Sequence, residues 1–287
     1  MKTTRQLLKI LSVFLLTATA AFFLMDHFGK NLQKNEELLS DNTLDSAAPI
    51  SLDIELVAIG DSLTEGVGDS TKRGGYVPLT AEELKRNPAV HSVHTRNFGK
   101  SGNTTKQITD RISGQEEIQA ALKKASVITV SAGGNDLIHK IRKSGFKADQ
   151  KFAEKSLEDY QNSLRQMINE IRSFNEDAPL FLFGIYNPYE KELKEVVYLQ
   201  MLVSDWNRVA EEETIEESNS FFIPVNQLFI SDEVTVAGED APGASTSDET
   251  ANPYLFEGDY FHPNEKGYQL MADTLSKEIL KVLNNEK

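Results

Sequence analysis

The 287-residue sequence contains no cysteine. A chain without thiols forms no disulfide, builds no thiolate metal site, offers no cysteine nucleophile and carries no lipid-modified cysteine. This absence does not identify the compartment. Basic residues are also scarce, because 30 Lys and Arg stand against 44 Asp and Glu, and the formal net charge is -14. No basic patch stands out, so nucleic acid is not expected as a partner.

Long apolar runs are rare, and the one clear example lies near the N-terminus. Lys2, Arg5 and Lys9 precede the sixteen uncharged residues ILSVFLLTATAAFFLM. A basic flank before an apolar run is typical of a secretory signal or membrane anchor. We predict that residues 1–25 form an uncleaved membrane anchor, because cleavage after Ala20 would leave an apolar N-terminus. The alternative is secretion after cleavage, and in both cases the domain lies outside the cytoplasm.

Residues 26–52 are polar and are interpreted as a linker, and residues 53–287 suit one α/β domain. Unalternated apolar runs predict strands at 54–60, 126–134, 180–188 and 221–225, with a weaker candidate at 91–99. Helical spacing fills the stretches 76–87, 104–124, 151–175, 190–217 and 264–284. This alternation predicts a three-layer α/β/α sandwich around a parallel sheet of about five strands.

Two short motifs after predicted strands offer a nucleophile and backbone donors. Gly60-Asp61-Ser62-Leu63 follows the first strand and contains a serine, although this composition also suits a simple turn. Gly99 and Gly102 flank a turn before a helix, where a backbone N–H is a suitable oxyanion donor. In a parallel sheet, sites gather at the carboxyl ends of the strands, where both motifs lie.

Two further motifs supply polar side chains. Asn135, in SAGGNDL, can donate hydrogen bonds to a developing oxyanion, although it can equally cap a helix. Asp259 and His262 lie three residues apart before the last helix. This spacing can bring a carboxylate to the histidine Nδ1 and leave Nε2 free as a base, although an isolated Asp-x-x-His is more often a polar loop.

The four motifs occur together and in this order, and the chain thereby resembles the SGNH hydrolases, also called GDSL-type esterases and lipases. The resemblance covers roughly residues 54–285. It implies a flavodoxin-like fold, with Ser62 as the nucleophile, His262 as the general base and Asp259 as the group that orients this base.

The resemblance also implies an oxyanion hole. Its donors would be the backbone N–H groups of Ser62 and Gly102 and the side chain of Asn135, with Gly99 as the fallback for Gly102. Such an enzyme cleaves carboxylic or thio esters through an acyl-enzyme and uses no cofactor and no metal. The sequence does not indicate the oligomeric state.

The expected substrates are small or polymer-bound esters, with lipid esters and acylated glycans as the classes that an anchored enzyme would meet. The predicted loop at 226–258 is mostly polar and acidic, which favours small or polymer-bound acyl groups over lipids. The stretch Tyr186-Asn187-Pro188-Tyr189 either lines the pocket or forms a turn, and Trp206 is expected in the core.

Two alternatives stay open. Gly60-Asp61 and Gly134-Asn135-Asp136 superficially resemble the blocks of metal-dependent phosphoesterases. That chemistry needs further His and Asp ligands, and the sequence has neither an Asp-x-His after the first strand nor a Gly-His-x-His near its end. The second alternative is a non-catalytic cell-surface binding module with the same fold.

Overall fold

The computed structural model describes residues 51–144, 150–188, 197–230 and 252–285. The predicted anchor at 1–25, nearly all of the predicted linker and residues 231–251 of the predicted loop lie outside these ranges. Within them, no helix is both long and apolar enough to cross a membrane.

Five parallel strands form one sheet, as predicted. The strands are β1 (Leu52–Gly60), β2 (Val90–Gly99), β3 (Val127–Ser131), β4 (Leu180–Phe183) and β5 (Ser220–Ile223). Their order in the sheet is β2-β1-β3-β4-β5, and every neighbouring pair is parallel. The chain therefore reverses its direction of winding between β1 and β3. Such a switch point opens a crevice at the carboxyl ends of these two strands.

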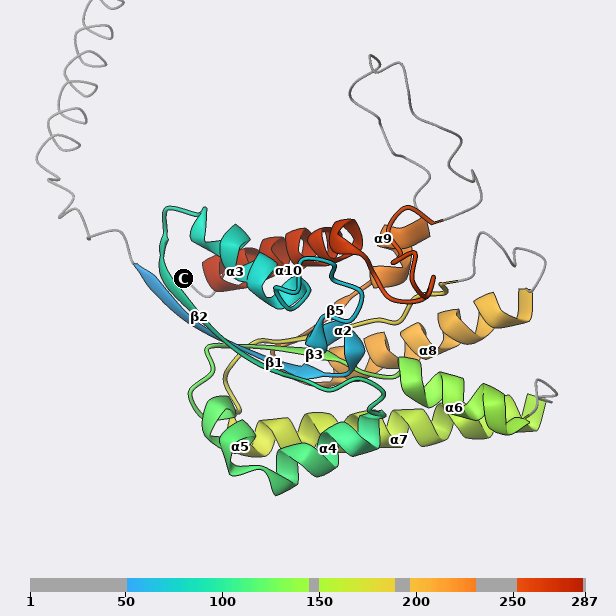
Figure 1. Ribbon diagram of the computed structural model, residues 1–287. Coiled ribbons are helices and arrows are strands. Elements are labelled where there is room, and N and C mark those ends of the chain that lie inside the picture. The colour runs from blue at the N-terminus through green and yellow to red at the C-terminus, as the bar shows by residue number, and fades with distance from the viewer. Residues whose placement is uncertain (1–50, 145–149, 189–196, 231–251, 286–287) are drawn as a thin grey trace, which may run out of the picture. The chain divides into compact units, whose positions relative to one another are not determined.

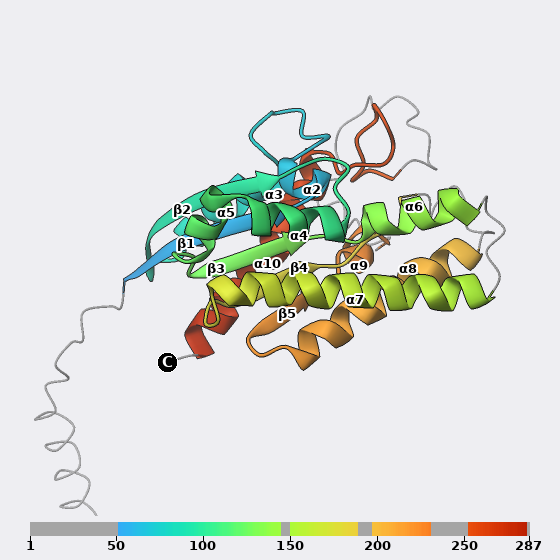
Figure 2. The same ribbon diagram turned by 90° about the horizontal axis from the view of Figure 1, so that it is seen from below.

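Helices cover both faces of the sheet (Figure 1, and Figure 2 from below). One layer consists of α3 (Tyr76–Lys85), α9 (Val225–Ile230) and α10 (Glu265–Asn285). The other consists of α4 (Thr105–Gly114), α5 (Glu116–Leu122), α6 (Gly134–Ser144), α7 (Gln150–Phe174) and α8 (Val197–Glu216). The short helix α2 (Ser62–Glu65) follows β1 directly. The three-layer sandwich expected from the sequence is confirmed.

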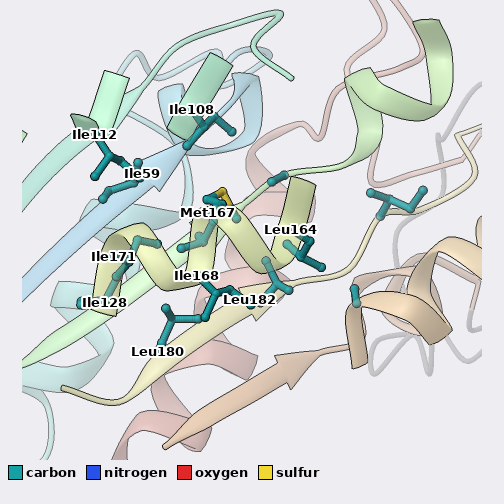
Figure 3. Close-up of a cluster of buried hydrophobic side chains, with 14 of the residues drawn as sticks. Ile59, Ile108, Ile112, Ile128, Leu164, Met167, Ile168, Ile171, Leu180 and Leu182 are labelled. Atoms are coloured by element: carbon teal, nitrogen blue, oxygen red, sulfur yellow. The ribbon is translucent and has the colours of Figure 1, made fainter. Parts of the chain in front are cut away.

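Two apolar cores lie on opposite faces of the sheet. Alternate residues of β1 divide between them, with Val57 and Ile59 in one core and Leu56 and Ala58 in the other. Figure 3 shows the first core, in which α7 packs across the strands. Trp206 belongs to this core: it is 1% exposed and its ring stacks on another aromatic ring, so the expected core position is confirmed.

The structure differs from the expected elements at several boundaries. The helix expected at 104–124 is two helices, because Gln115 adopts an extended conformation between α4 and α5. The strand expected at 126–134 ends at Ser131, since Gly133 has a φ of 104° and α6 begins at the next residue. The loop was expected to begin at residue 226, but residues 226–230 belong to helix α9. The strand expected at 180–188 ends at Phe183, so the following residues are free to line a site.

A methyl group at Gly99 tests how tightly α2 packs on β2. A Cβ at this position would overlap the backbone of Thr64 and Glu65, whereas a Cβ at Gly114 would meet no atom within 4 Å. We expect Gly99→Ala to lower the free energy of unfolding by about 1–3 kcal/mol. Gly114→Ala, the matched control, should change it by less than ~1 kcal/mol, in the stabilising direction. Urea denaturation of both variants measures the difference, and equal midpoints would contradict the packing.

Candidate active site

Ser62 lies at the switch point, as the first residue of α2. Asp61 caps this helix, because its Oδ1 accepts a hydrogen bond from the Leu63 N–H at 3.0 Å. Gly66, with a φ of 89°, ends the helix after one turn. The N–H of a first helical residue has no partner inside the helix, and no acceptor for the Ser62 N–H lies among the described residues. Ser62 itself is 7% exposed.

A buried network of hydroxyl groups holds α2 against β3. Ser131 Oγ donates to Asp61 Oδ1 at 2.7 Å and lies 2.7 Å from Thr64 Oγ1, which in turn lies 3.0 Å from the Tyr76 hydroxyl. All four residues are buried. None of the four sequence motifs indicates this network. Its only local signal is Ser131, a polar residue at the end of the apolar run that forms β3.

Burial dominates the electrostatics of Asp61. It raises the pKa of the carboxyl from 3.8 to about 6, against the hydrogen bonds from Ser131 and Leu63, which lower it. The carboxylate is therefore mostly ionised at neutral pH, and the folded protein bears the cost of keeping that charge away from water.

Asp259 and His262 form a hydrogen-bonded pair. The histidine Nδ1 lies 2.6 Å from Asp259 Oδ2, while Oδ1 accepts from the N–H groups of Phe261 and His262 at 2.9 and 3.0 Å. Burial alone would raise the pKa of Asp259, but these hydrogen bonds outweigh it and lower the pKa. A carboxylate on Nδ1 selects the tautomer in which Nε2 accepts a proton.

Contacts from three directions hold the segment that carries this pair. The Tyr186 hydroxyl donates to the Phe261 carbonyl at 2.6 Å, and the Phe256 N–H donates to the His262 carbonyl at 2.8 Å. A Cβ at Gly68 would lie 3.1 Å from the His262 Cβ, so the loop after α2 packs on this segment. The first and last motifs of the sequence are thereby brought together. Among the described residues, no hydrogen bond joins the Ser62 hydroxyl to the His262 ring. Such bonds are often long without substrate.

Asn135 lies in the first turn of α6, and its Nδ2 donates to the Asn103 carbonyl at 3.0 Å. The neighbouring Asp136 accepts from the N–H and hydroxyl of Thr105 at 2.8 and 3.0 Å. These two contacts join the start of α6 to the turn before α4. Gly102 lies in that turn with a φ of 79°, exposed to solvent, and no acceptor for its N–H lies among the described residues.

Gly99, the fallback for Gly102, has a different environment. Its N–H donates to Asn97 Oδ1 at 2.8 Å, and its α-carbon packs on the backbone of α2. Of the two glycines, only Gly102 therefore has an N–H without an acceptor among the described residues.

A cavity of about 50 Å³ opens beside Ser62. The residues after three strands line it: Asp61, Ser62 and Leu63 after β1, Ser131, Ala132, Gly134 and Asn135 at the end of β3, and Gly184, Ile185 and Tyr186 after β4, together with Phe261. Ser62, Asn135 and Phe261, which precedes His262, therefore line the same cavity. Gly102, Asp259 and His262 do not line it. In the described part of the chain, no group of three or more His, Asp or Glu side chains is arranged to hold a metal ion.

A model of the GDSL-like lipase/acylhydrolase family matches residues 58–270. The chain therefore belongs to this family, and the resemblance found in the sequence is confirmed.

Two curated bacterial proteins are similar to the chain. The uncharacterized protein YpmR of Bacillus subtilis is 28% identical over 79% of this chain and 82% of its own length. The spore germination lipase LipC of Bacillus licheniformis is 24% identical over 77% of this chain and 94% of its own length.

Solved structures of lipases and carbohydrate esterases share the fold. The lipase Lip_vut3 from a goat rumen metagenome has a TM-score of 0.62 at 24% identity, covering 78% of this chain and 96% of its own. The acetyl-xylooligosaccharide esterase Axe2 of a Geobacillus species has a TM-score of 0.54 at 22% identity, covering 80% and 96%. A family 3 carbohydrate esterase of Clostridium thermocellum has a TM-score of 0.52 at 18% identity, covering 81% and 99%.

Replacing Asp61 by asparagine tests the cost of its buried charge. The unfolded carboxyl ionises near pH 3.8 and the folded one near pH 6, so the folded state binds more protons between these values and loses stability as the pH rises through them. Asp61→Asn removes this dependence, while its Oδ1 can still accept from Leu63 and Ser131. Relative to wild type, we expect the variant to gain ~3 kcal/mol in free energy of unfolding from about pH 4 to 7.

Denaturant titrations across this pH range measure the difference between variant and wild type. Asn162→Ala, at an exposed position of α7 and without a titrating group, is the control and should give a difference that does not change with pH. A constant difference for Asp61→Asn as well would contradict the raised pKa of this carboxyl.

Proposed function

We propose that the protein is a serine ester hydrolase in which Ser62 is the nucleophile, His262 the general base and Asp259 the group that orients the base. The observation that carries this proposal is the 2.6 Å contact between Asp259 and His262, on a segment adjoining a cavity that Ser62 lines. A histidine whose Nδ1 is held by a carboxylate presents Nε2 as a base.

The reaction proceeds in two half-reactions. Ser62 Oγ attacks the ester carbonyl carbon while its proton passes to His262 Nε2, and the tetrahedral intermediate collapses as the alcohol leaves with that proton. Water then attacks the acyl-enzyme and gives a proton to the same nitrogen, and the second tetrahedral intermediate collapses to the carboxylic acid as that proton returns to Ser62 Oγ. Asp259 stabilises the imidazolium in both steps without taking up its proton.

The proposed oxyanion hole uses the free donors of the site. The N–H groups of Ser62 and Gly102 have no acceptor among the described residues, which supports their assignment. The side-chain amide of Asn135 has two N–H groups. One donates a hydrogen bond to the Asn103 carbonyl, which orients the amide so that the other N–H can face the reacting oxygen.

The relatives support ester chemistry and name two substrate classes. One curated relative is named a lipase, and two structural neighbours are esterases of carbohydrates. Three solved variants of Axe2, described as catalytic mutants, replace a serine, an aspartate and a histidine by alanine. In that protein the aspartate and histidine are three residues apart, which is the spacing of Asp259 and His262. We therefore propose lipid or acylated-glycan esters as substrates.

Removing the Ser62 hydroxyl is the decisive test. The purified full-length chain is assayed on p-nitrophenyl acetate, butyrate and octanoate, with and without a chelator. We expect Ser62→Ala to lower kcat by roughly 10⁴–10⁶-fold, and the chelator to have no effect. Ser70→Ala, at an exposed position of the following loop, is the control and should retain wild-type activity. Turnover that survives Ser62→Ala would refute the assignment, and turnover abolished by the chelator would favour a metal-dependent phosphoesterase.

The Asn135 side chain is tested separately, because an oxyanion donor acts mainly in the transition state. We expect Asn135→Ala to lower kcat about 10²–10³-fold with little change in KM. Asn162→Ala, at an exposed position of α7, should leave both constants unchanged. Steady-state kinetics on the best p-nitrophenyl ester separate the two effects. A rise in KM alone would assign Asn135 to substrate binding and remove it from the oxyanion hole.

A further inference from the structure

The residues after β4 form one wall of the Ser62 cavity. Gly184, Ile185 and Tyr186 leave the sheet at its carboxyl edge and line the same cavity as Ser62 and Asn135. Gly184 and Ile185 are buried, and Tyr186 is half-buried. The position of this wall decides how much room an acyl group has.

A side-chain amide on α8 fixes the inner part of the wall. Asn207 Oδ1 accepts from the Ile185 N–H at 2.8 Å, and Asn207 Nδ2 donates to the Ile185 carbonyl at 2.8 Å. Behind the wall, a Cβ at Gly184 would lie only 2.7 Å from the Phe222 ring and 2.8 Å from Asn207 Oδ1. The backbone therefore has no space to move away from the cavity.

Tyr186 fixes the outer part of the wall. Its hydroxyl donates to the Phe261 carbonyl at 2.6 Å, and its ring meets Phe229 of α9 edge to face, with 4.7 Å between the ring centres. The wall is thus bonded both to α8 and to the segment that carries His262. A long acyl chain would have to break these contacts in order to pass through it.

The size of the cavity matches a short acyl group. Its volume is about 50 Å³, only a few times the roughly 10–15 Å³ that one buried water occupies, so the cavity has room for a small group only. Without the ester oxygen, an acetyl group has three non-hydrogen atoms, whereas butyryl has five and octanoyl has nine.

We propose that Ile185 and Tyr186 limit the acyl group to acetyl, so that the protein is an acetylesterase. This inference rests on the proposed function. With the acyl group in the cavity, the leaving group would extend outside it, so the alcohol part of the ester is free to be large, as in an acetylated polysaccharide.

The chain-length dependence of kcat/KM tests the inference. The full-length protein and its variants are assayed on p-nitrophenyl acetate, butyrate and octanoate. Each kcat/KM is divided by the rate constant for hydrolysis of the same ester by hydroxide, which corrects for the different reactivities of the esters. One extra methylene in a tight pocket changes kcat/KM about 10–200-fold. We expect the wild type to prefer acetate over butyrate by at least about 10-fold and over octanoate by at least about 100-fold.

Shortening Ile185 tests whether this wall sets the limit. We expect Ile185→Ala to raise the ratio of butyrate to acetate activity at least about 10-fold, and Ile185→Val to raise it by a smaller factor. The smaller change keeps the test available if the alanine variant does not fold. Ile118→Ala, a truncation in the core at α5, is the control for general loosening and should leave the ratio unchanged.

The outcomes separate the two proposals. Ser62-dependent activity that is equal or greater on octanoate overturns the acetyl limit and leaves the serine esterase intact. Acetate preference that Ile185→Ala and Ile185→Val both leave unchanged overturns the role of this wall. Absence of Ser62-dependent turnover on every ester overturns the proposed function and the inference with it.

Discussion

Asp61 Oδ1 joins the two strands on either side of the switch point. It accepts one hydrogen bond from the start of α2 and a second from Ser131 at the end of β3. The direction in which Ser62 leaves β1 is thereby coupled to the position of the strand that leads to Asn135. Residues that follow both strands line the cavity, so this oxygen helps to set its shape.

Two carboxylates of the site have opposite environments. Asp61 is 4% exposed, and burial raises its pKa to about 6. The Asp259 side chain is 35% exposed and accepts hydrogen bonds from the His262 ring and two N–H groups, which lower its pKa. Asp259 therefore stays charged over a wide pH range, as the partner of a base must. Asp61 instead holds the start of α2 against β3 through its two hydrogen bonds. Its negative charge, present above about pH 6, lowers the stability of the fold.

Much of the architecture could be predicted from the sequence, because buried parallel strands appear as continuous apolar runs and each strand lies within a few residues of its expected place. The contact of Asp259 with His262 was foreseeable as well, since it is local. The network from Asp61 to Ser131 and Thr64 was not, because it joins residues about 70 positions apart. The stretch from Tyr186 was a candidate for lining the pocket, and Tyr186 does line the cavity. Its hydrogen bond to Phe261 spans 75 positions and has no local signal.

Strand direction also determines where the domain can be attached to something else. The chain enters the sheet at Leu52, and the nine residues of β1 carry it about 30 Å to the edge where Ser62 lies. Helix α10 runs back from the site, so its last turn lies near the beginning of β1 (Figure 1). Both ends of the domain thus leave from the edge opposite the cavity. A solid support or a second domain joined at either end therefore leaves the edge that carries Ser62 facing outward, where a large polymer can reach it.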